Sequence, residues 1–367
     1  MRILGFMTGT SLDAVDMAVL DTDGETIQAF GPAGERKLRE ETRDLLLMAT
    51  EIARGWPRDR PEPEIFVEAA QAVADEHFHA AESFLAEHGL SWEEFDLLGV
   101  HGQTVLHERP TPERIGRTVQ LLDAERLARL TRRPVAFDFR TADVAAGGQG
   151  APLAPIYHEA RARASGLEAP IAALNIGGVA NITLVDEDGA LLAFDTGPGN
   201  GMIDLMLQER GLGRFDENGR LAAAGKVDED VLARFLASAY FAGPAPKSLD
   251  RYDFPLDLVQ PLSAEDAAAT LVAFTAEAVV KAFDHGARPT ALIVCGGGRR
   301  NPQIMKVLTE RCPTPVKTAE DYGWRGDAIE AEAFAYLAAR TARGLPISFP
   351  GTTGVREAMT GGRIVRP

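Results

Sequence analysis

The sequence predicts an α/β protein of two domains, and two observations support this fold class. The first is length, because 367 residues exceed what one ordinary hydrophobic core accommodates. The second is a pattern repeated in residues 5–24 and 174–189: an apolar strand, a loop of small residues, a second apolar strand and an Asp-x-Asp-Gly turn. An Asp-Gly pair between apolar segments is typical of a β-hairpin, so each glycine-rich loop is expected to join two antiparallel strands.

The hairpin pattern also indicates what the loops can bind. In a P-loop or a dinucleotide-binding fold the glycines precede a helix, so both of those folds are disfavoured. Two glycine-rich hairpin loops that face each other across a cleft would instead hold a nucleotide by its phosphates. The alternative is a pair of unrelated tight turns.

The other elements are short apolar strands and amphipathic helices. Strands are expected at 2–7, 15–21, 26–30, 97–100, 134–139 and 291–295. Helices are expected at 64–87, 124–130, 228–238, 264–285 and 327–343. The first helix begins just after Pro61 and Pro63, and the last ends at Gly344, which are the usual places for these residue types.

A segment rich in glycine and alanine, 145–155, is the expected crossing between the two domains. The predicted boundaries are therefore 1–145 for an N-terminal domain and 146–345 for a C-terminal domain. The tail, 346–367, is expected to return to the first domain.

Composition limits the classes of partner. The formal net charge of −16 argues against nucleic acid and anionic membrane surfaces, because both require a basic face. The two cysteines, Cys295 and Cys312, cannot form a disulfide framework, and a reducing cytoplasm is the simple interpretation. No run of about 18 apolar residues predicts a membrane span, and no signal-peptide core is expected after Met1.

The first glycine-rich loop offers groups suited to phosphate. Gly9, Thr10 and Ser11 supply backbone N–H groups and two hydroxyls where glycine permits close approach. Asp13 and Asp16 are candidate Mg²⁺ ligands, because carboxylate oxygens suit hard cations. The alternative is that the polar side chains only cap the turn through local hydrogen bonds.

Asp195 is the candidate catalytic residue. It follows an apolar strand and precedes the rigid sequence Thr-Gly-Pro-Gly-Asn of 196–200. A carboxylate held with little freedom at a strand end suits a general base, which must lie within hydrogen-bonding reach of the proton that it removes. A turn-capping aspartate is the alternative interpretation.

Two polar groups follow strands of the first domain. The segment His101-Gly-Gln-Thr lies at the end of a buried strand, where loops often carry function, although a satisfied buried histidine explains it equally well. Arg140 could bind a carboxylate with both arms of its guanidinium. An ordinary ion pair with Asp138 or Asp143 is the competing interpretation.

Three further features lie in the second half of the chain. The glycines at 296–298 would let backbone pass against an adenine ring or a ribose, although a tight turn is the alternative. Glu330 stands among apolar residues near the start of the last helix, so a half-buried carboxylate would need a polar partner such as a sugar hydroxyl. Lys247 and Arg251 are possible phosphate or substrate contacts, with exposed surface charges as the default interpretation.

Together the paired hairpins, the strand-end aspartate and the late Gly-Gly-Gly loop resemble the actin-like superfamily of sugar kinases, acetate kinases and heat-shock chaperones. Within it the chain closely resembles the anhydro-N-acetylmuramic acid kinases. The resemblance runs through GFMTGTSLDAVD, HGQTV, TVQLLDAERLA, FDFRTADVAAGGQGAPLAP, LNIGGVANIT, FDTGPGN, PKSLDRYDF, VCGGGRRNP and DAIEAEAFAYLA. It implies a two-domain actin-like sugar kinase fold with duplicated β-hairpin phosphate loops and an interdomain cleft.

The resemblance also implies roles for individual residues. Asp195 matches the family's catalytic base, Arg140 and Glu330 match residues that contact the anhydro sugar, and Gln103 and Thr104 lie in a substrate-side segment. The implied ATP contacts are Gly9, Thr10, Ser11, Leu12, Asp13, Ala14, Val15 and Asp16 in the first loop, Gly177 and Gly178 in the second, and Gly296, Gly297 and Gly298.

The reaction that the resemblance implies consumes ATP and water, with Mg²⁺, and opens the 1,6-anhydro bridge of anhydro-N-acetylmuramic acid. The product is N-acetylmuramic acid 6-phosphate, and the role is peptidoglycan recycling by a cytoplasmic homodimer. Two alternatives stay open: a kinase of a plainer anhydro sugar such as anhydroglucose, and a non-enzymatic ATP-driven switch. The first alternative arises because Leu106 stands where the family often has a basic residue. A separate departure from the family pattern is Ala14, which replaces a common glycine in the first loop.

Overall fold

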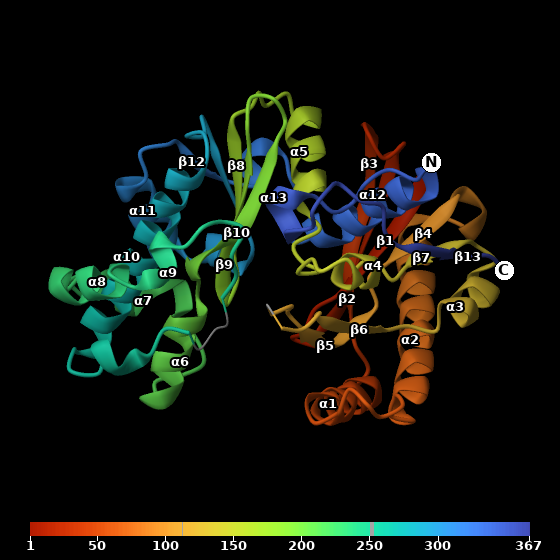
Figure 1. Cartoon of the computed structure of the whole chain (residues 1–367), viewed down its shortest axis with the longest axis horizontal. Coiled ribbons are helices and arrows are strands. Elements are labelled where there is room, and N and C mark those ends of the chain that lie inside the picture. Colours follow the sequence, from red (N-terminus) through yellow and green to blue (C-terminus); the bar gives the residue numbers. More distant parts are fainter. Residues whose placement is uncertain (112, 250–252) are drawn as a thin grey trace. The chain divides into compact units, whose positions relative to one another are not determined.

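The computed structural model describes residues 1–111, 113–249 and 253–367. The chain divides into two compact units, drawn together in Figure 1. Unit 1 comprises Met1–Ala164 and Ala328–Pro367, and unit 2 comprises Ser165–Asp327. Within the described ranges, no helix combines the length and the apolar character that a membrane span requires.

Unit 1 is built on a six-stranded sheet of order β13-β7-β4-β1-β2-β3. Its strands are β1 (Arg2–Thr8), β2 (Ala14–Thr22), β3 (Ile27–Lys37), β4 (Leu97–Val100), β7 (Val135–Phe137) and β13 (Arg363–Val365). β1, β2 and β3 form an antiparallel meander, whereas β1, β4 and β7 are parallel neighbours. A separate antiparallel hairpin consists of β5 (Gln103–Glu108) and β6 (Arg117–Leu121).

Unit 2 repeats this topology with a five-stranded sheet of order β10-β9-β8-β11-β12. Its strands are β8 (Ile171–Ile176), β9 (Val179–Val185), β10 (Leu191–Pro198), β11 (Leu292–Cys295) and β12 (Val316–Thr318). Again the first three strands form an antiparallel meander and the first strand has a parallel neighbour. The two predicted hairpins are therefore confirmed, and each Asp-Gly turn has its glycine at positive φ, 83° at Gly24 and 81° at Gly189.

Helices pack on both sheets. Those of unit 1 are α1 (Glu40–Arg54), α2 (Ile65–His88), α3 (Ala124–Thr131), α4 (Thr141–Ala145), α5 (Pro155–Ala164), α12 (Ile329–Arg343) and α13 (Pro350–Thr353). Those of unit 2 are α6 (Gly201–Glu209), α7 (Arg220–Ala224), α8 (Glu229–Leu236), α9 (Ala239–Ala242), α10 (Ala264–Ala282) and α11 (Pro302–Arg311). Short 3-10 helices include η4 (Phe283–His285) and η5 (Gly297–Arg300). The core of unit 2 surrounds α10, most of whose residues are buried.

Helix α12 contacts β1, β2 and β4 of unit 1, and Figure 1 shows it in blue beside the red N-terminal strands. Two glycines permit this contact. A Cβ atom at Gly5 would lie 2.0 Å from the carbonyl oxygen of Ala331, and one at Gly99 would lie 2.3 Å from that of Phe334. Because no side chain fits there, the helix backbone rests directly on the strands.

The compact units differ from the boundaries expected from sequence. The first crossing lies after Ala164 instead of residue 145, and α12 belongs to unit 1 instead of the C-terminal domain. The cause is long-range packing: α5 contacts both α12 and β3, so the chain stays in unit 1 through this helix. The tail, residues 346–367, also lies in unit 1.

The predicted strands and helices are confirmed in place, with differences in extent. The predicted strand 134–139 is limited to β7, Val135–Phe137. β3 continues to Lys37 beyond the predicted end at residue 30. The predicted helix at 264–285 ends as the 3-10 turn η4. Several elements were not predicted, among them α1, the β5–β6 hairpin, α5 and β12.

Candidate active site

The first glycine-rich loop joins β1 to β2 in unit 1. Its backbone turns at Leu12, where φ is 55° and the N–H donates to the carbonyl oxygen of Gly9 at 3.2 Å. Positive φ is uncommon for a residue with a side chain, and here it directs Leu12 into a hydrophobic cluster. Thr10 and Ser11 stay exposed, so they present hydroxyls and backbone to solvent, whereas Leu12 can offer a ligand only its backbone.

The two candidate Mg²⁺ ligands lie in different settings. The Asp13 side chain is exposed, and its Oδ1 accepts hydrogen bonds from the Ser11 hydroxyl at 2.7 Å and from the Ala14 N–H at 3.0 Å. This is the turn-capping pattern that the alternative interpretation expects. Asp16 lies within β2, paired with Met7 across the hairpin. Ala14 and Val15 are buried.

Metal binding by protein side chains alone finds no support in residues 1–111, 113–249 and 253–367. No three His, Cys, Asp or Glu side chains in these ranges gather closely enough to hold an ion. The carboxylates of Asp13 and Asp16 are ligands of the type that Mg²⁺ binds. This ion usually completes its coordination shell with water and substrate phosphates.

The second glycine-rich loop, in unit 2, is fixed against the start of α6. The carbonyl of Gly177 accepts from Asn200 N–H at 2.7 Å, and that of Gly178 accepts from the N–H groups of Gly199 and Gly201, each at 3.0 Å. A Cβ at Gly199 would lie 2.2 Å from the Gly177 oxygen. The rigid turn before α6 and the second loop therefore form one backbone-lined surface.

The Gly-Gly-Gly segment lies beside that loop, because β11 runs parallel to β8 and pairs Cys295 with Asn175. Gly296 has φ of 74°, and a Cβ there would meet Asn175 Oδ1 at 2.2 Å, whereas a Cβ at Gly297 would meet nothing within 4 Å. Three glycine-rich segments thus converge at the carboxyl ends of two parallel strands. Ligands of open α/β sheets commonly bind at such strand ends.

Arg299, directly after these glycines, fixes the segment. Its side chain is 5% exposed and donates to the carbonyl of Gly296 at 2.8 Å. It also forms ion pairs with Glu320 at 2.8 Å and with Asp327 at 3.0 Å. Asp327 therefore pairs with arginine, a role that the sequence did not indicate.

Asp195 lies at a bulge of β10, where the register against β9 shifts between Asp195 and Gly197. Its N–H donates to the carbonyl of Lys247 at 3.0 Å, and its Oδ2 accepts from the N–H of Leu249 at 2.7 Å. The hydroxyl of Tyr240 donates to its carbonyl oxygen. The carboxylate is therefore fixed in orientation, as both the general-base and the turn-capping interpretations require.

In unit 1, Arg140 does not form the ion pairs of the competing interpretation. Its Nε donates to His101 Nε2 at 2.9 Å, and its Nη1 donates to the carbonyl of Gly150 at 2.7 Å. Within the described part of the chain, no carboxylate lies within ion-pair distance of its guanidinium, because Asp138 pairs instead with Arg363 at 2.9 Å.

The other competing carboxylate, Asp143, is buried and engaged elsewhere. Its Oδ1 accepts from Gly150 N–H at 2.6 Å, and its Oδ2 accepts from the hydroxyl of Thr353 in α13. Asp143 therefore fixes the turn whose carbonyl receives Arg140. No local pattern could indicate this role, because Thr353 lies 210 residues away.

The electrostatics follow from burial. Burial lowers the pKa of Arg140 to about 10, and the charges of Glu330 and Asp143 oppose that shift, so the guanidinium stays charged at neutral pH. Burial also holds the pKa of His101 well below its usual value, aided by Arg140, so its ring is neutral and Nε2 accepts. Desolvation by the surrounding protein raises the pKa of Glu330, and the charge of Arg140 opposes this rise. The Glu330 side chain is exposed, whereas the sequence predicted a half-buried carboxylate.

The polar residues after His101 enter the β5–β6 hairpin. Gln103 is buried, its Nε2 donates to the Thr104 carbonyl at 3.2 Å, and its Oε1 has no hydrogen-bond partner among the described residues. Thr104 Oγ1 accepts from Gln120 at 3.2 Å. Leu106 is buried in the same cluster as Leu12, so its side chain serves packing.

The chain matches the family model of anhydro-N-acetylmuramic acid kinase over residues 1–367. The chain belongs to the anhydro-N-acetylmuramic acid kinase family. It is 80% identical over 366 residues to the anhydro-N-acetylmuramic acid kinase of Caulobacter vibrioides, an alignment that covers 100% of this chain and 99% of that protein. The kinase of the same name from Phenylobacterium zucineum is 70% identical over 368 residues, with 100% of both chains covered. That of Brucella anthropi is 51% identical over 364 residues, covering 99% of this chain and 98% of that protein.

Membership of the anhydro-N-acetylmuramic acid kinase family confirms the resemblance inferred from the motifs. The sheet order repeated in both units is the duplicated arrangement expected of the two-domain actin-like sugar kinase fold. Of the predicted site residues, Arg140 and Glu330 interact electrostatically within unit 1, and the two glycine segments of unit 2 adjoin each other. Arg251 lies outside the described residues.

Proposed function

We propose that this chain is an ATP-dependent anhydro-N-acetylmuramic acid kinase that hydrolyses the 1,6-anhydro bridge and phosphorylates the 6-oxygen. Family membership and the 80% identical relative support the reaction class. The observation that carries the substrate assignment is Arg140, a charged guanidinium that no carboxylate of the described residues approaches within ion-pair distance, although the charge of Glu330 acts on it. A lactyl carboxylate would supply the missing anion, and it distinguishes muramic acid from plainer sugars.

In the proposed mechanism, Asp195 is the general base. An anhydro sugar has no free 6-hydroxyl, so a water must first become nucleophilic. Asp195 removes a proton from that water, whose oxygen forms a bond to the anomeric carbon while the bond from this carbon to O6 breaks. O6 then bonds to the γ-phosphorus as the bond to the β–γ bridging oxygen breaks, leaving ADP. The hydrogen bond from Leu249 N–H to Asp195 supports this role, because it fixes the orientation of the carboxylate.

Nucleotide binding is assigned to the glycine-rich segments. We propose that the backbone of Gly9 to Asp16 and the segments at Gly177–Gly178 and Gly296–Gly298 bind ATP. Asp13 and Asp16 would hold Mg²⁺ together with water and phosphate oxygens. When bound, the ion neutralises charge on the phosphates. Gln103 and Thr104 would bind the sugar, and the unsatisfied Oε1 of Gln103 supports a donor from the ligand.

Two further assignments accompany this proposal. A cytoplasmic location agrees with both cysteines being buried and free. A homodimer agrees with the exposed apolar side chains Leu47, Met48 and Ile52 along α1. Sedimentation equilibrium measures the second assignment directly, and a monomeric mass at micromolar concentration would exclude it.

The test of the proposed function is turnover of anhydro-N-acetylmuramic acid against anhydroglucose, with ATP and with the product mass measured. The expected product gains one phosphate and one water relative to the anhydro-muramyl substrate. A gain of phosphate alone excludes bridge hydrolysis, and equal rates on both sugars exclude recognition of the lactyl group. Leu106 packs in the hydrophobic cluster and offers no cation to the lactyl group, so anhydroglucose stays the alternative that this assay tests.

A further inference from the structure

Lys247 is a cation of unit 2 that binds the protein itself. Its Nζ donates to the carbonyls of Tyr240 at 2.9 Å, Gly243 at 3.0 Å and Phe241 at 3.4 Å, and to His285 Nε2 at 3.2 Å. An ammonium has three N–H groups, so these four acceptors saturate it. The side chain is half-buried, and burial lowers the pKa of Lys247. A phosphate contact would require these bonds to break.

The carbonyls that Lys247 binds end a helix that needs such support. Helix α9 has four residues, too few for a helix to be stable alone in water. The last carbonyls of a helix have no partner within it, and a cation beside them satisfies them. The ammonium also lies 4.7 Å from the ring centroid of Tyr240 and 5.7 Å from that of Phe194. Lys247 therefore joins α9, η4 and the strand that carries Asp195.

The same segment holds Asp195 at three atoms. The backbone oxygen of Lys247 accepts from Asp195 N–H, Leu249 N–H donates to Asp195 Oδ2, and Tyr240 donates its hydroxyl to the Asp195 carbonyl. Each of these partners lies within residues 240–249. The Lys247 ammonium crosslinks this segment through its bonds to the carbonyls of 240–243, and it connects the segment to His285. Loss of the ammonium would release the backbone that orients the carboxylate.

We infer that Lys247 is a positioning residue that acts through Asp195, and that it contacts neither ATP nor sugar. The inference rests on the proposed role of Asp195 as the base. Displacement of a catalytic group by about 1 Å can lower a rate on the order of 100-fold. Lys247→Met keeps the length and the apolar stem but removes all four hydrogen bonds. It is expected to lower kcat about 10- to 100-fold and to change the KM values for ATP and sugar less than about threefold.

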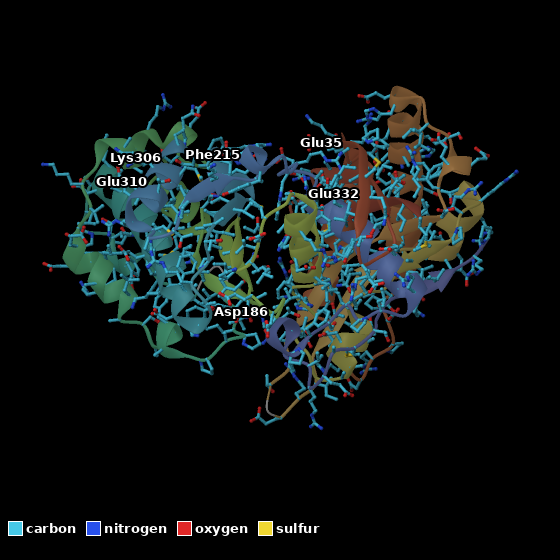
Figure 2. The ribbon with its side chains drawn as sticks, turned by 90° about the horizontal axis from the view of Figure 1, so that it is seen from above. Glu35, Asp186, Phe215, Lys306, Glu310 and Glu332 are labelled. Carbon is cyan, nitrogen blue, oxygen red and sulfur yellow. The ribbon has the colours of Figure 1, made fainter. Side chains whose placement is uncertain are left out.

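The matched control is Lys306→Met, because Lys306 is exposed on α11 and is labelled in Figure 2. This control is expected to keep wild-type kcat, KM and Tm. A tenfold rise in the KM for ATP of Lys247→Met with kcat unchanged would overturn the inference, since that result identifies a phosphate contact. Unchanged kcat and KM in Lys247→Met would overturn it as well.

Two further variants keep the test decisive if Lys247→Met does not fold. Tyr240→Phe removes only the hydroxyl that contacts the Asp195 carbonyl, and a several-fold loss of kcat at constant KM is expected. Lys247→Arg keeps the charge but places a planar fork where a point donor fits, so it is expected to fold and to lose part of kcat. Wild-type kcat in both of these variants would refute the positioning role.

A double variant separates this inference from the proposed function. If Lys247 acts through Asp195, adding Lys247→Met to Asp195→Asn costs no further rate beyond that of Asp195→Asn. An additional 10-fold loss in the double variant would overturn the inference. If Asp195→Asn itself turns over normally, the assigned base is wrong, and this failure concerns the proposed function.

Discussion

Arg140→Ala tests the assignment of the sugar's carboxylate to unit 1. The guanidinium is charged and half-buried, and among the described residues its hydrogen-bond partners are His101 and the Gly150 carbonyl. A hydrogen bond that involves a charged group contributes roughly 1.5–3 kcal/mol. Since 1.4 kcal/mol corresponds to a factor of ten, the KM for anhydro-N-acetylmuramic acid is expected to rise about 10- to 100-fold. The KM for ATP is expected to stay constant.

The assay compares two substrates that differ in the lactyl group. Initial rates are measured with anhydro-N-acetylmuramic acid and with anhydro-N-acetylglucosamine, which lacks the carboxylate. Wild type is expected to prefer the former, and Arg140→Ala is expected to lose that preference. Arg129→Ala serves as the control, because Arg129 forms an exposed pair with Glu125 at 3.7 Å. A preserved preference in Arg140→Ala, or a rise in the KM for ATP alone, would refute the assignment.

Three more predictions concern chemistry, packing and pH. Asp195→Asn is expected to lower turnover by about 10² to 10⁴ with nucleotide affinity intact, measured by steady-state rates and calorimetry; retained turnover contradicts the assigned base. Gly5→Ala places a Cβ 2.0 Å from the Ala331 oxygen and is expected to destabilise unit 1 by about 1–3 kcal/mol, whereas Gly55→Ala, with 3.9 Å of space, is expected to stay near wild type in thermal unfolding. Burial lowers the pKa of His77 to about 4 in the folded protein, against 6.5 for an exposed histidine. As pH falls from 6.5 toward 4, the unfolded chain is protonated first, so the free energy of unfolding decreases over this range. His77→Leu should reduce this slope in urea unfolding, and an unchanged slope would exclude His77 as a cause.

Local sequence patterns predicted the hairpins and the buried strands. The Asp-Gly turns require positive φ, and Gly24 and Gly189 have it, so the chemistry of two residues determined the turn. Helix α2 was predicted nearly to its ends, because apolar residues are frequent along it and two prolines precede it. Helix α1 was not predicted: its average character is polar, and its burial depends on contacts with α2 and β5.

For the candidate site, too, the sequence identified individual groups but not the long-range interactions between them. The glycines and Asp195 were identified because small residues and a strand-end carboxylate are visible in a few consecutive letters. The interactions that decide what each group does are long-range. Arg140 contacts a histidine 39 residues away, and Lys247 reaches one 38 residues away. No local pattern could distinguish Arg140, which forms no ion pair with the described residues, from Lys247, whose ammonium is saturated by three carbonyls and a histidine.

The discontinuity of unit 1 has a consequence for synthesis on the ribosome. Residues 165–327 are continuous and contain all of unit 2, whereas the strands of unit 1 need α12 to cover Gly5 and Gly99. At roughly 5–20 residues per second, α12 is synthesised on the order of ten seconds or more after β1, β2 and β4. The second unit can therefore complete its fold first, which reverses the usual N-terminal-first order. Until α12 emerges, the β1–β2–β4 surface is exposed to chaperones and to other nascent chains.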